Sequence, residues 1–162
     1  MPWASVSANR TRTSVSKRKS TASERRDSAA VDFRFETEVR VRFAETDAQG
    51  IAHNSVYLVW FEVARTDFLR HFGWTYREME AGGVFLPVIE AHCEYKRPAR
   101  YDDELVVETS GRLVSMVRLT FEYVVTVAGQ TDVVATGYTA HAATDPAGKP
   151  CRLPARVHEV FA

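Results

Sequence analysis

The amino-acid sequence predicts an α+β fold in which an antiparallel sheet packs against one long helix. In residues 55–72, aromatic and apolar side chains recur every three or four positions, which is typical of a helix with one buried face. Apolar and polar residues alternate in four later stretches, as they do in half-buried strands. These stretches are residues 84–97, 104–112, 117–127 and 132–144. Turns separate the strands, and no helix-sized crossovers lie between them, which favours antiparallel neighbours.

A further strand precedes the helix and begins near Thr37. Its alternating residues are Val39, Val41 and Phe43 on one face, and Arg40 and Arg42 on the other. This pattern is typical of a strand with one buried face. We therefore expect Phe43 to face the core together with the two valines.

The predicted helix has recognisable ends. Asn54 is of a residue type that often caps helix N-termini, and Gly73 suits the C′ position that follows the last turn. The apolar stripe between them consists of Tyr57, Trp60, Phe61, Ala64, Phe68 and Phe72. We expect this stripe to face the sheet.

The strands after the helix are joined by short turns. In residues 84–97, Ile89, Ala91, Cys93 and Tyr95 alternate with Glu90, His92 and Glu94. Residues 132–144 include small side chains, among them Gly137, which would let the helix approach the sheet closely. Residues 145–148 form a strong turn signal, and residues 152–161 are expected to form a short helix.

The first 30 residues differ in composition from the rest of the chain. They are rich in Ser, Thr, Arg and Lys and have few large apolar side chains, so they cannot bury enough surface to fold. We expect a disordered basic tail over residues 1–30 and one domain over residues 31–162. An Arg- and Ser-rich transit peptide is a less favoured alternative, and a true translation start near Val31 is a third.

The charge and cysteine content narrow the class of protein. Seven Lys and Arg against two acidic residues give residues 1–30 a charge of +5, and because the chain sums to zero, the remainder carries −5. An acidic domain argues against nucleic acid as the main partner. No apolar run approaches the ~20 residues that span a bilayer, which argues against a membrane protein. Cys93 and Cys151 form no CxxC pair, which favours reduced thiols and a cytoplasmic location.

Residues 45–57 hold the strongest functional signal. Asp47 lies in a turn with Gly50, just before the helix, where the first backbone N–H groups have no acceptor within the helix. A carboxylate beside such donors can attack a carbonyl while the N–H groups stabilise the oxyanion. Asp in a Gly-containing turn is also common for structural reasons alone, and from spacing both interpretations are equally favoured.

The same segment matches the motif of a known family. The matching residues are Asp47, Gly50, Ile51, Asn54, Tyr57, Phe61, Glu62, Ala64 and Arg65. In this pattern the sequence resembles the hotdog-fold acyl-CoA thioesterases of the hydroxybenzoyl-CoA thioesterase type. Residues 95–103 and 148–154 add weaker support, and the resemblance covers roughly residues 39–154.

This resemblance implies a hotdog fold, in which a five-stranded antiparallel sheet wraps around a long central helix. It implies an acyl-CoA thioesterase, which hydrolyses a thioester to a carboxylic acid and coenzyme A without a further cofactor. Asp47 would be the catalytic nucleophile or general base, and the amide around Asn54 would polarise the carbonyl. Gly50 and Ile51 would lie beside the substrate. The family also implies a homodimer or homotetramer with its active site at a subunit interface.

Several nearby side chains allow both a functional and a structural interpretation. His53 would position water or contact the thioester, or else serve as a turn residue, and the residues favour neither. Glu62 and Arg65, three residues apart on the helix, favour a structural ion pair over a second catalytic pair, and Glu62 stays a weak alternative to Asp47. For Tyr57, core packing is favoured over substrate contact by about two to one, because it lies on the apolar stripe.

Lys96, Arg97 and Arg100 lie at the end of a predicted strand. They are candidates for binding the phosphates of coenzyme A. Solvated charges on a loop are at least as well favoured.

Other functions are less well supported. The histidines have no spacing typical of metal ligands, so no metal site is expected. A hotdog hydratase or dehydratase would carry an Asn-Pro pair that the loop lacks. An acyl-CoA-binding regulator without turnover remains the non-enzymatic alternative. The acyl group, and the choice between coenzyme A and acyl carrier protein, are left open by the sequence.

Overall fold

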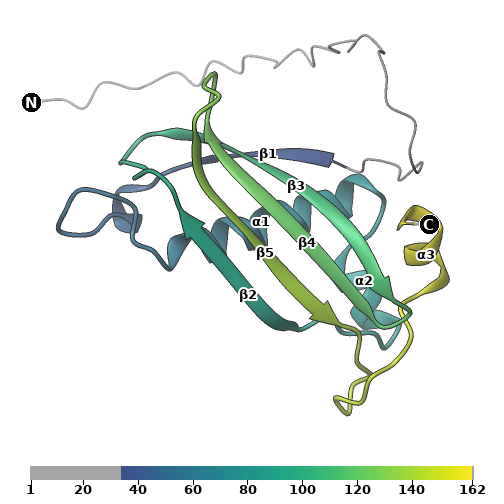
Figure 1. Cartoon of the computed structure of the whole chain (residues 1–162). Coiled ribbons are helices and arrows are strands. Elements are labelled where there is room, and N and C mark those ends of the chain that lie inside the picture. Colours follow the sequence, from purple (N-terminus) through teal and green to yellow (C-terminus); the bar gives the residue numbers. More distant parts are fainter. Residues whose placement is uncertain (1–33, 162) are drawn as a thin grey trace, which may run out of the picture.

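The computed structural model describes residues 34–161, and Figure 1 shows their arrangement. In chain order the elements are β1 (Arg34–Arg40), the 3-10 helix η1 (Phe43–Glu45), α1 (Val56–His71), α2 (Tyr76–Ala81), β2 (Val88–Tyr95), β3 (Glu104–Ser115), β4 (Arg118–Val127), β5 (Val133–Ala142) and α3 (Ala155–Phe161). The α+β class is therefore confirmed. The tail predicted over residues 1–30 lies outside the described residues.

The five strands form one antiparallel sheet in the order β1-β3-β4-β5-β2. The strands β1 and β2 follow each other in the chain but lie at opposite edges of the sheet. Between them, α1 crosses one face of the sheet (Figure 1). This crossing confirms the prediction of a sheet wrapped around a long helix.

The core lies between α1 and the sheet. Trp60, Phe61 and Phe68 are buried there, and the ring of Phe61 stacks on Tyr123 with centroids 4.2 Å apart. At Gly137 of β5, a Cβ atom would come within 2.6 Å of the Phe61 ring. The small residue is therefore needed for the close approach of helix and sheet, as the sequence predicted.

A chain of hydrogen bonds runs through this core. The hydroxyl of Tyr123 lies 2.7 Å from Thr139 Oγ1, which lies 2.9 Å from His141 Nε2, while His141 Nδ1 lies 3.2 Å from the carbonyl oxygen of Leu86. Because a carbonyl can only accept, His141 donates from Nδ1 and accepts at Nε2. The hydroxyl of Thr139 therefore donates to His141 and accepts from Tyr123.

Burial sets the protonation states of the titratable side chains in this chain of hydrogen bonds. It lowers the pKa of His141 to about 4, and it raises the pKa of Tyr123 to about 12. Both side chains are therefore neutral at pH 7.

The structure corrects two details at the start of the helix region. Phe43 does not face the core: β1 ends at Arg40, and Phe43 begins η1 with its side chain 78% exposed and its ring edge-on to Tyr101. The N-cap of α1 is Ser55 and not Asn54, and no side chain bonds the cap. Gly73 follows α1 with φ +79°, which confirms it at the C′ position.

Other elements differ in extent from their predictions. The short helix α2 was not predicted, although Thr75 and Glu78 form a reciprocal capping box at its start. The strand β2 is shorter than residues 84–97, and β3 extends beyond residue 112 to Ser115. The C-terminal helix covers residues 155–161 of the predicted 152–161.

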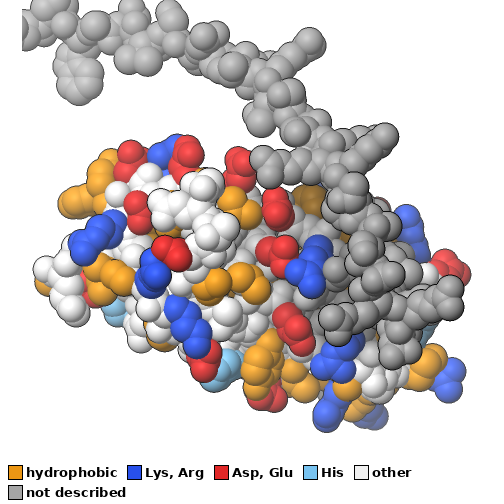
Figure 2. Space-filling view, turned by 45° about the horizontal axis from the view of Figure 1, so that its top comes forward, with side chains coloured by type: hydrophobic (Ala, Val, Ile, Leu, Met, Phe, Trp, Pro, Cys, Tyr) orange, Lys and Arg blue, Asp and Glu red, His pale blue; other side chains and the backbone are white. Residues whose placement is uncertain are grey.

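The outer face of the sheet is charged. Arg34 pairs with Glu108 across β1 and β3, and the hydroxyl of Tyr138 bonds Glu90 across β5 and β2. Figure 2 shows acidic and basic side chains interspersed with apolar ones on the viewed side of the molecule. Within residues 34–161, no helix is long and apolar enough to cross a membrane.

Candidate active site

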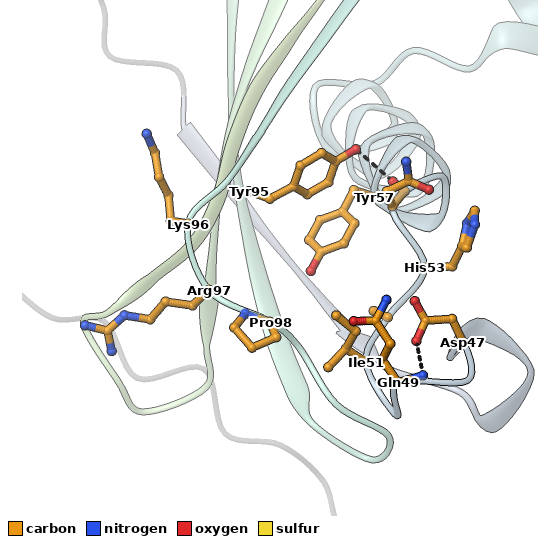
Figure 3. A pocket seen from close by; sticks show the side chains of 11 residues that line it. Asp47, Gln49, Ile51, His53, Tyr57, Tyr95, Lys96, Arg97 and Pro98 are labelled. Atoms are coloured by element: carbon orange, nitrogen blue, oxygen red, sulfur yellow. Dashed lines mark hydrogen bonds between the residues drawn. The ribbon is translucent and has the colours of Figure 1, made fainter.

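A cleft of about 570 Å³ opens beside the N-terminal end of α1. One wall comes from the loop before the helix and the other from the end of β2 (Figure 3). Its lining includes seven of the residues selected from the sequence, namely Asp47, Ile51, His53, Asn54, Tyr57, Lys96 and Arg97. Gly50 and Arg100 do not line it.

Asp47 is held in a tight turn. Its backbone N–H donates to Ile51 O and its carbonyl accepts from Gly50 N–H, each at 2.9 Å, and Gly50 takes a φ of +72° that favours glycine. One carboxylate oxygen of Asp47 accepts a 2.8 Å bond from Gln49 N–H. Among the described residues the other oxygen has no donor, and Figure 3 shows it on the side of the helix start.

Glu45 holds this loop in place through hydrogen bonds, a role that the sequence did not indicate. Its carbonyl accepts from His53 N–H at 2.8 Å, and its buried carboxylate accepts from the Arg42 side chain at 2.9 Å. Burial acts to raise the pKa of Glu45, but the bonds and charge of Arg42 outweigh burial and the pKa is lowered. Glu45 therefore stays ionised and fixes both ends of the loop.

His53 and Asn54 occupy the turn that enters α1. His53 is exposed, and its Nδ1 lies 2.8 Å from Ser55 Oγ, as expected for a turn residue. The carbonyl of Asn54 accepts a 3.0 Å bond from the hydroxyl of Tyr95. Within residues 34–161, the backbone N–H of Asn54 has no acceptor, and Asn54 lines the cleft.

Tyr57 belongs both to the cleft and to the core. It is 2% exposed, and its ring packs 4.7 Å from Trp60 and 5.0 Å from Tyr95. Burial raises the pKa of Tyr57 despite a hydrogen bond to Ala99 that acts to lower it. Its hydroxyl is therefore neutral, and Tyr57 is a rigid wall of the cleft.

The basic residues at the second wall are already paired. Lys96 pairs with Glu94 and Arg97 with Asp132, and all four side chains are about half exposed. Exposed ion pairs contribute little stability, so both cations can exchange their partners for a ligand. Arg100 lies further along, where its backbone N–H bonds Asp103.

Glu62 and Arg65 form the predicted ion pair, with Arg65 Nη2 3.4 Å from Glu62. Arg65 is buried and also donates from Nε to the Tyr76 hydroxyl at 3.1 Å. Neither residue lines the cleft. This geometry fits the structural interpretation of the pair.

Four lining residues were missed by the sequence analysis: Gln49, Ala52, Tyr95 and Pro98. Tyr95 and Pro98 fall in the weaker motif at residues 95–103, which was the available signal. Within residues 34–161, no three His, Cys, Asp or Glu side chains gather closely enough to hold a metal ion.

Comparison with known proteins identifies the class. The chain is 31% identical over 121 residues to a 1,4-dihydroxy-2-naphthoyl-CoA hydrolase of Synechococcus, covering 70% of this chain and 80% of that protein. It is 37% identical over 75 residues to the acyl-CoA thioester hydrolase YbgC of Escherichia coli, covering 46% of this chain and 56% of that protein.

A solved structure agrees with these relatives. The DHNA-CoA thioesterase of Staphylococcus aureus superposes with a TM-score of 0.75 at 30% identity, covering 79% of this chain and 88% of that one. The fold and these relatives define a hotdog-fold protein of the thioesterase class. The model of the thioesterase-like superfamily matches residues 41–161, and the chain belongs to that family.

Proposed function

We propose that this protein is an acyl-CoA thioesterase. The observation that carries the proposal is that two residues lining the same cleft have groups without a partner among the described residues: a carboxylate oxygen of Asp47 and the N–H of Asn54. The names of the relatives, which act on acyl-CoA thioesters, support the same substrate class.

In this mechanism the Asn54 N–H donates to the thioester carbonyl and stabilises the oxyanion that forms. Asp47 either attacks the carbonyl carbon or removes a proton from the water that attacks. The C–S bond then breaks, and the electron pair leaves with sulfur. Because a thiol has a pKa of about 8.5, the thiolate departs with little help from an acid. If Asp47 attacks, the acyl group is left on its carboxylate as a mixed anhydride, which water then hydrolyses to restore Asp47. In both routes water supplies the oxygen of the free carboxylic acid, and its proton ends on the thiolate or in solvent.

The remaining selected residues have supporting roles in this proposal. Tyr57 and Ile51 form the wall that contacts the acyl end, while Gly50 shapes the turn that presents Asp47. Lys96 and Arg97 exchange their partners for the phosphates of coenzyme A. Arg100, outside the cleft, would contact only the far end of that carrier. His53, exposed beside the free N–H, would position water.

The exposed apolar residues support a dimer. Leu58, Val59 and Val63 are exposed on α1, and Val88 and Ile89 are exposed on β2, which lies at the edge of the sheet. An unpaired edge with an apolar face beside it favours pairing with a second copy. We therefore propose a homodimer joined through β2, or a homotetramer built from two such dimers.

The dimer is tested by sedimentation velocity. The wild-type chain should sediment as a dimer or tetramer, and Val59→Lys should shift it toward a monomer by placing a charge on the apolar face. Glu159→Lys is the control: it changes an exposed residue of α3, a helix that contacts β3, and β3 is separated from β2 by β4 and β5. A monomeric wild-type chain at micromolar concentration would refute the proposed assembly.

The activity is tested by thiol release from a panel of aliphatic and aromatic acyl-CoAs, with wild type and Asp47→Ala side by side. Turnover that is lost in the variant supports the thioesterase. Tight binding without turnover in both proteins favours the acyl-CoA-binding regulator. In that case Asp47 would only stabilise its turn, where its carboxylate accepts the bond from Gln49 N–H. The cytoplasmic location and the absence of a cofactor stay predictions.

A further inference from the structure

The hydroxyl of Tyr95 joins the two walls of the cleft. Tyr95 ends β2, and its hydroxyl donates to the carbonyl oxygen of Asn54 at 3.0 Å, across 41 positions of sequence (Figure 3). Its ring packs edge-on against Tyr57 with centroids 5.0 Å apart. The ring contact and the hydroxyl bond together fix the side chain at two points. The edge strand is therefore attached directly to the turn that begins α1.

The peptide groups on the other side of Asn54 are held independently. His53 donates its N–H to Glu45 O at 2.8 Å, and its carbonyl accepts from Val56 N–H at 3.0 Å. These bonds fix the peptide group between His53 and Asn54, which carries the Asn54 N–H. The next peptide group is held by two bonds: Tyr95 donates to its carbonyl at 3.0 Å, and its Ser55 N–H donates to His53 Nδ1 at 3.3 Å. Asn54 itself has no side-chain cap bond and is exposed, so its backbone orientation depends on these neighbours.

We propose that Tyr95 is a positioning residue for the reaction, acting through Asn54. This inference rests on the proposed thioesterase function. The hydroxyl ties the Asn54 carbonyl to the opposite wall of the cleft, which Asn54 and Asp47 both line. Without the hydroxyl, the backbone torsions of Asn54 lose one of the bonds that hold them, and its N–H is held less firmly in the turn. Tyr95 does not itself contact the reacting atoms.

The test is Tyr95→Phe, which removes the hydroxyl and keeps the ring against Tyr57. Small misplacements of a catalytic group lower rates by up to about 100-fold, so we expect kcat to fall about 10-fold. KM should change less than about 3-fold, because a donor that acts on the oxyanion contributes little to binding of the ground state. The pH dependence of kcat should keep its shape, since Asp47 is untouched.

The matched control is Tyr101→Phe. Tyr101 is also an exposed tyrosine, but it does not line the cleft; its ring contacts Phe43, and within residues 34–161 its hydroxyl has no partner. Its kcat and KM should stay at wild-type values. Amide hydrogen exchange gives a readout that does not need turnover: residues 53–56 should exchange faster in Tyr95→Phe and at the wild-type rate in Tyr101→Phe.

The outcomes separate this inference from the function on which it rests. An active wild type with unchanged kcat in Tyr95→Phe overturns the positioning role and leaves the thioesterase standing. Unchanged exchange at residues 53–56 overturns it as well. A wild type without turnover on any acyl-CoA overturns both proposals. A fall in KM and kcat together with global loss of exchange protection would show a role in folding and overturn the positioning role.

Discussion

The cleft and the helix–sheet interface contain similar polar side chains, which are exposed in the cleft and buried at the interface. At the interface, His141 and Thr139 are buried, and each has a hydrogen-bond partner on both sides. In the cleft, His53 and Asn54 are exposed, and Asp47 keeps an oxygen without a donor. A buried polar group must be satisfied or it destabilises the fold, whereas an unsatisfied group at a cleft is available to a ligand. The comparison separates residues that maintain the fold from residues suited to chemistry.

Asp47→Asn gives the largest expected effect. The amide keeps an oxygen for the bond from Gln49 N–H, so the free energy of unfolding should change by less than about 1 kcal/mol. Turnover should fall by about 10³-fold, equal to roughly 4 kcal/mol in the barrier, because the amide neither attacks nor accepts a proton. Thiol release and denaturant unfolding measure the two quantities. Glu62→Gln, a carboxylate outside the cleft, should keep its turnover, and near-normal turnover in Asp47→Asn would remove Asp47 from the mechanism.

Lowering the pH should lower the free energy of unfolding through His141 at the helix–sheet interface. Burial lowers the pKa of His141 to about 4, while an unfolded chain binds that proton near pH 6.5. Between these values the unfolded state binds more protons, so stability falls as the pH falls from about 6.5 to about 4 and is unaffected by His141 below that. The loss reaches at most about 3 kcal/mol.

The measurement is denaturant unfolding at several pH values for wild type and His141→Gln. Carboxylates such as Glu45, whose pKa is lowered, add their own loss at lower pH, so the difference between the two proteins is the relevant quantity. That difference should shrink between pH 6.5 and pH 4. A constant difference for His141→Gln would mean that His141 is already charged in the folded state.

Thr139→Val has the smallest of these expected effects and tests whether a buried residue of the helix–sheet interface affects the cleft. The substitution keeps the shape of the side chain but leaves His141 Nε2 buried without a donor. We expect a loss of about 2 kcal/mol in the free energy of unfolding. The kcat of the folded protein should stay within about 2-fold of wild type, since Thr139 does not line the cleft. A large fall in kcat would show that the two regions are coupled.

Much of the fold could be predicted from the sequence because its elements are long and periodic. The apolar stripe of α1 and the alternation of β4 each depend on local order alone. Phe43 was wrongly predicted to face the core, because an alternating pattern can continue in the sequence after the strand itself has ended. The helix α2 was missed because six residues carry too little periodicity, although its capping box was readable.

The site was predicted more completely on one wall than on the other, where only Lys96 and Arg97 were selected. The loop before α1 carries its motif in consecutive residues, so Asp47 and Asn54 could be selected together. Tyr95 could not be assigned, because its bond to Asn54 joins residues 41 positions apart and depends on β2 lying at the edge beside the helix start. The same limit applies to Arg100, whose distance from the cleft is set by the turn that follows Pro98.

The strand order also determines when the cleft can form. Every residue that lines it lies between positions 47 and 98, yet β2 is held in the sheet by β5, where Ala91 lies opposite Thr139. During synthesis, the residues of both walls therefore leave the ribosome well before the strand that supports one of them. The pairings of β3 with β4 and of β4 with β5 join neighbouring segments, whereas β1 and β2 pair across longer sequence separations. We therefore expect the two hairpins to form before β1 and β2 close onto them. The cleft is thus among the last parts of the molecule to assemble, and a chain that stops before β5 carries all of its residues without having the cleft.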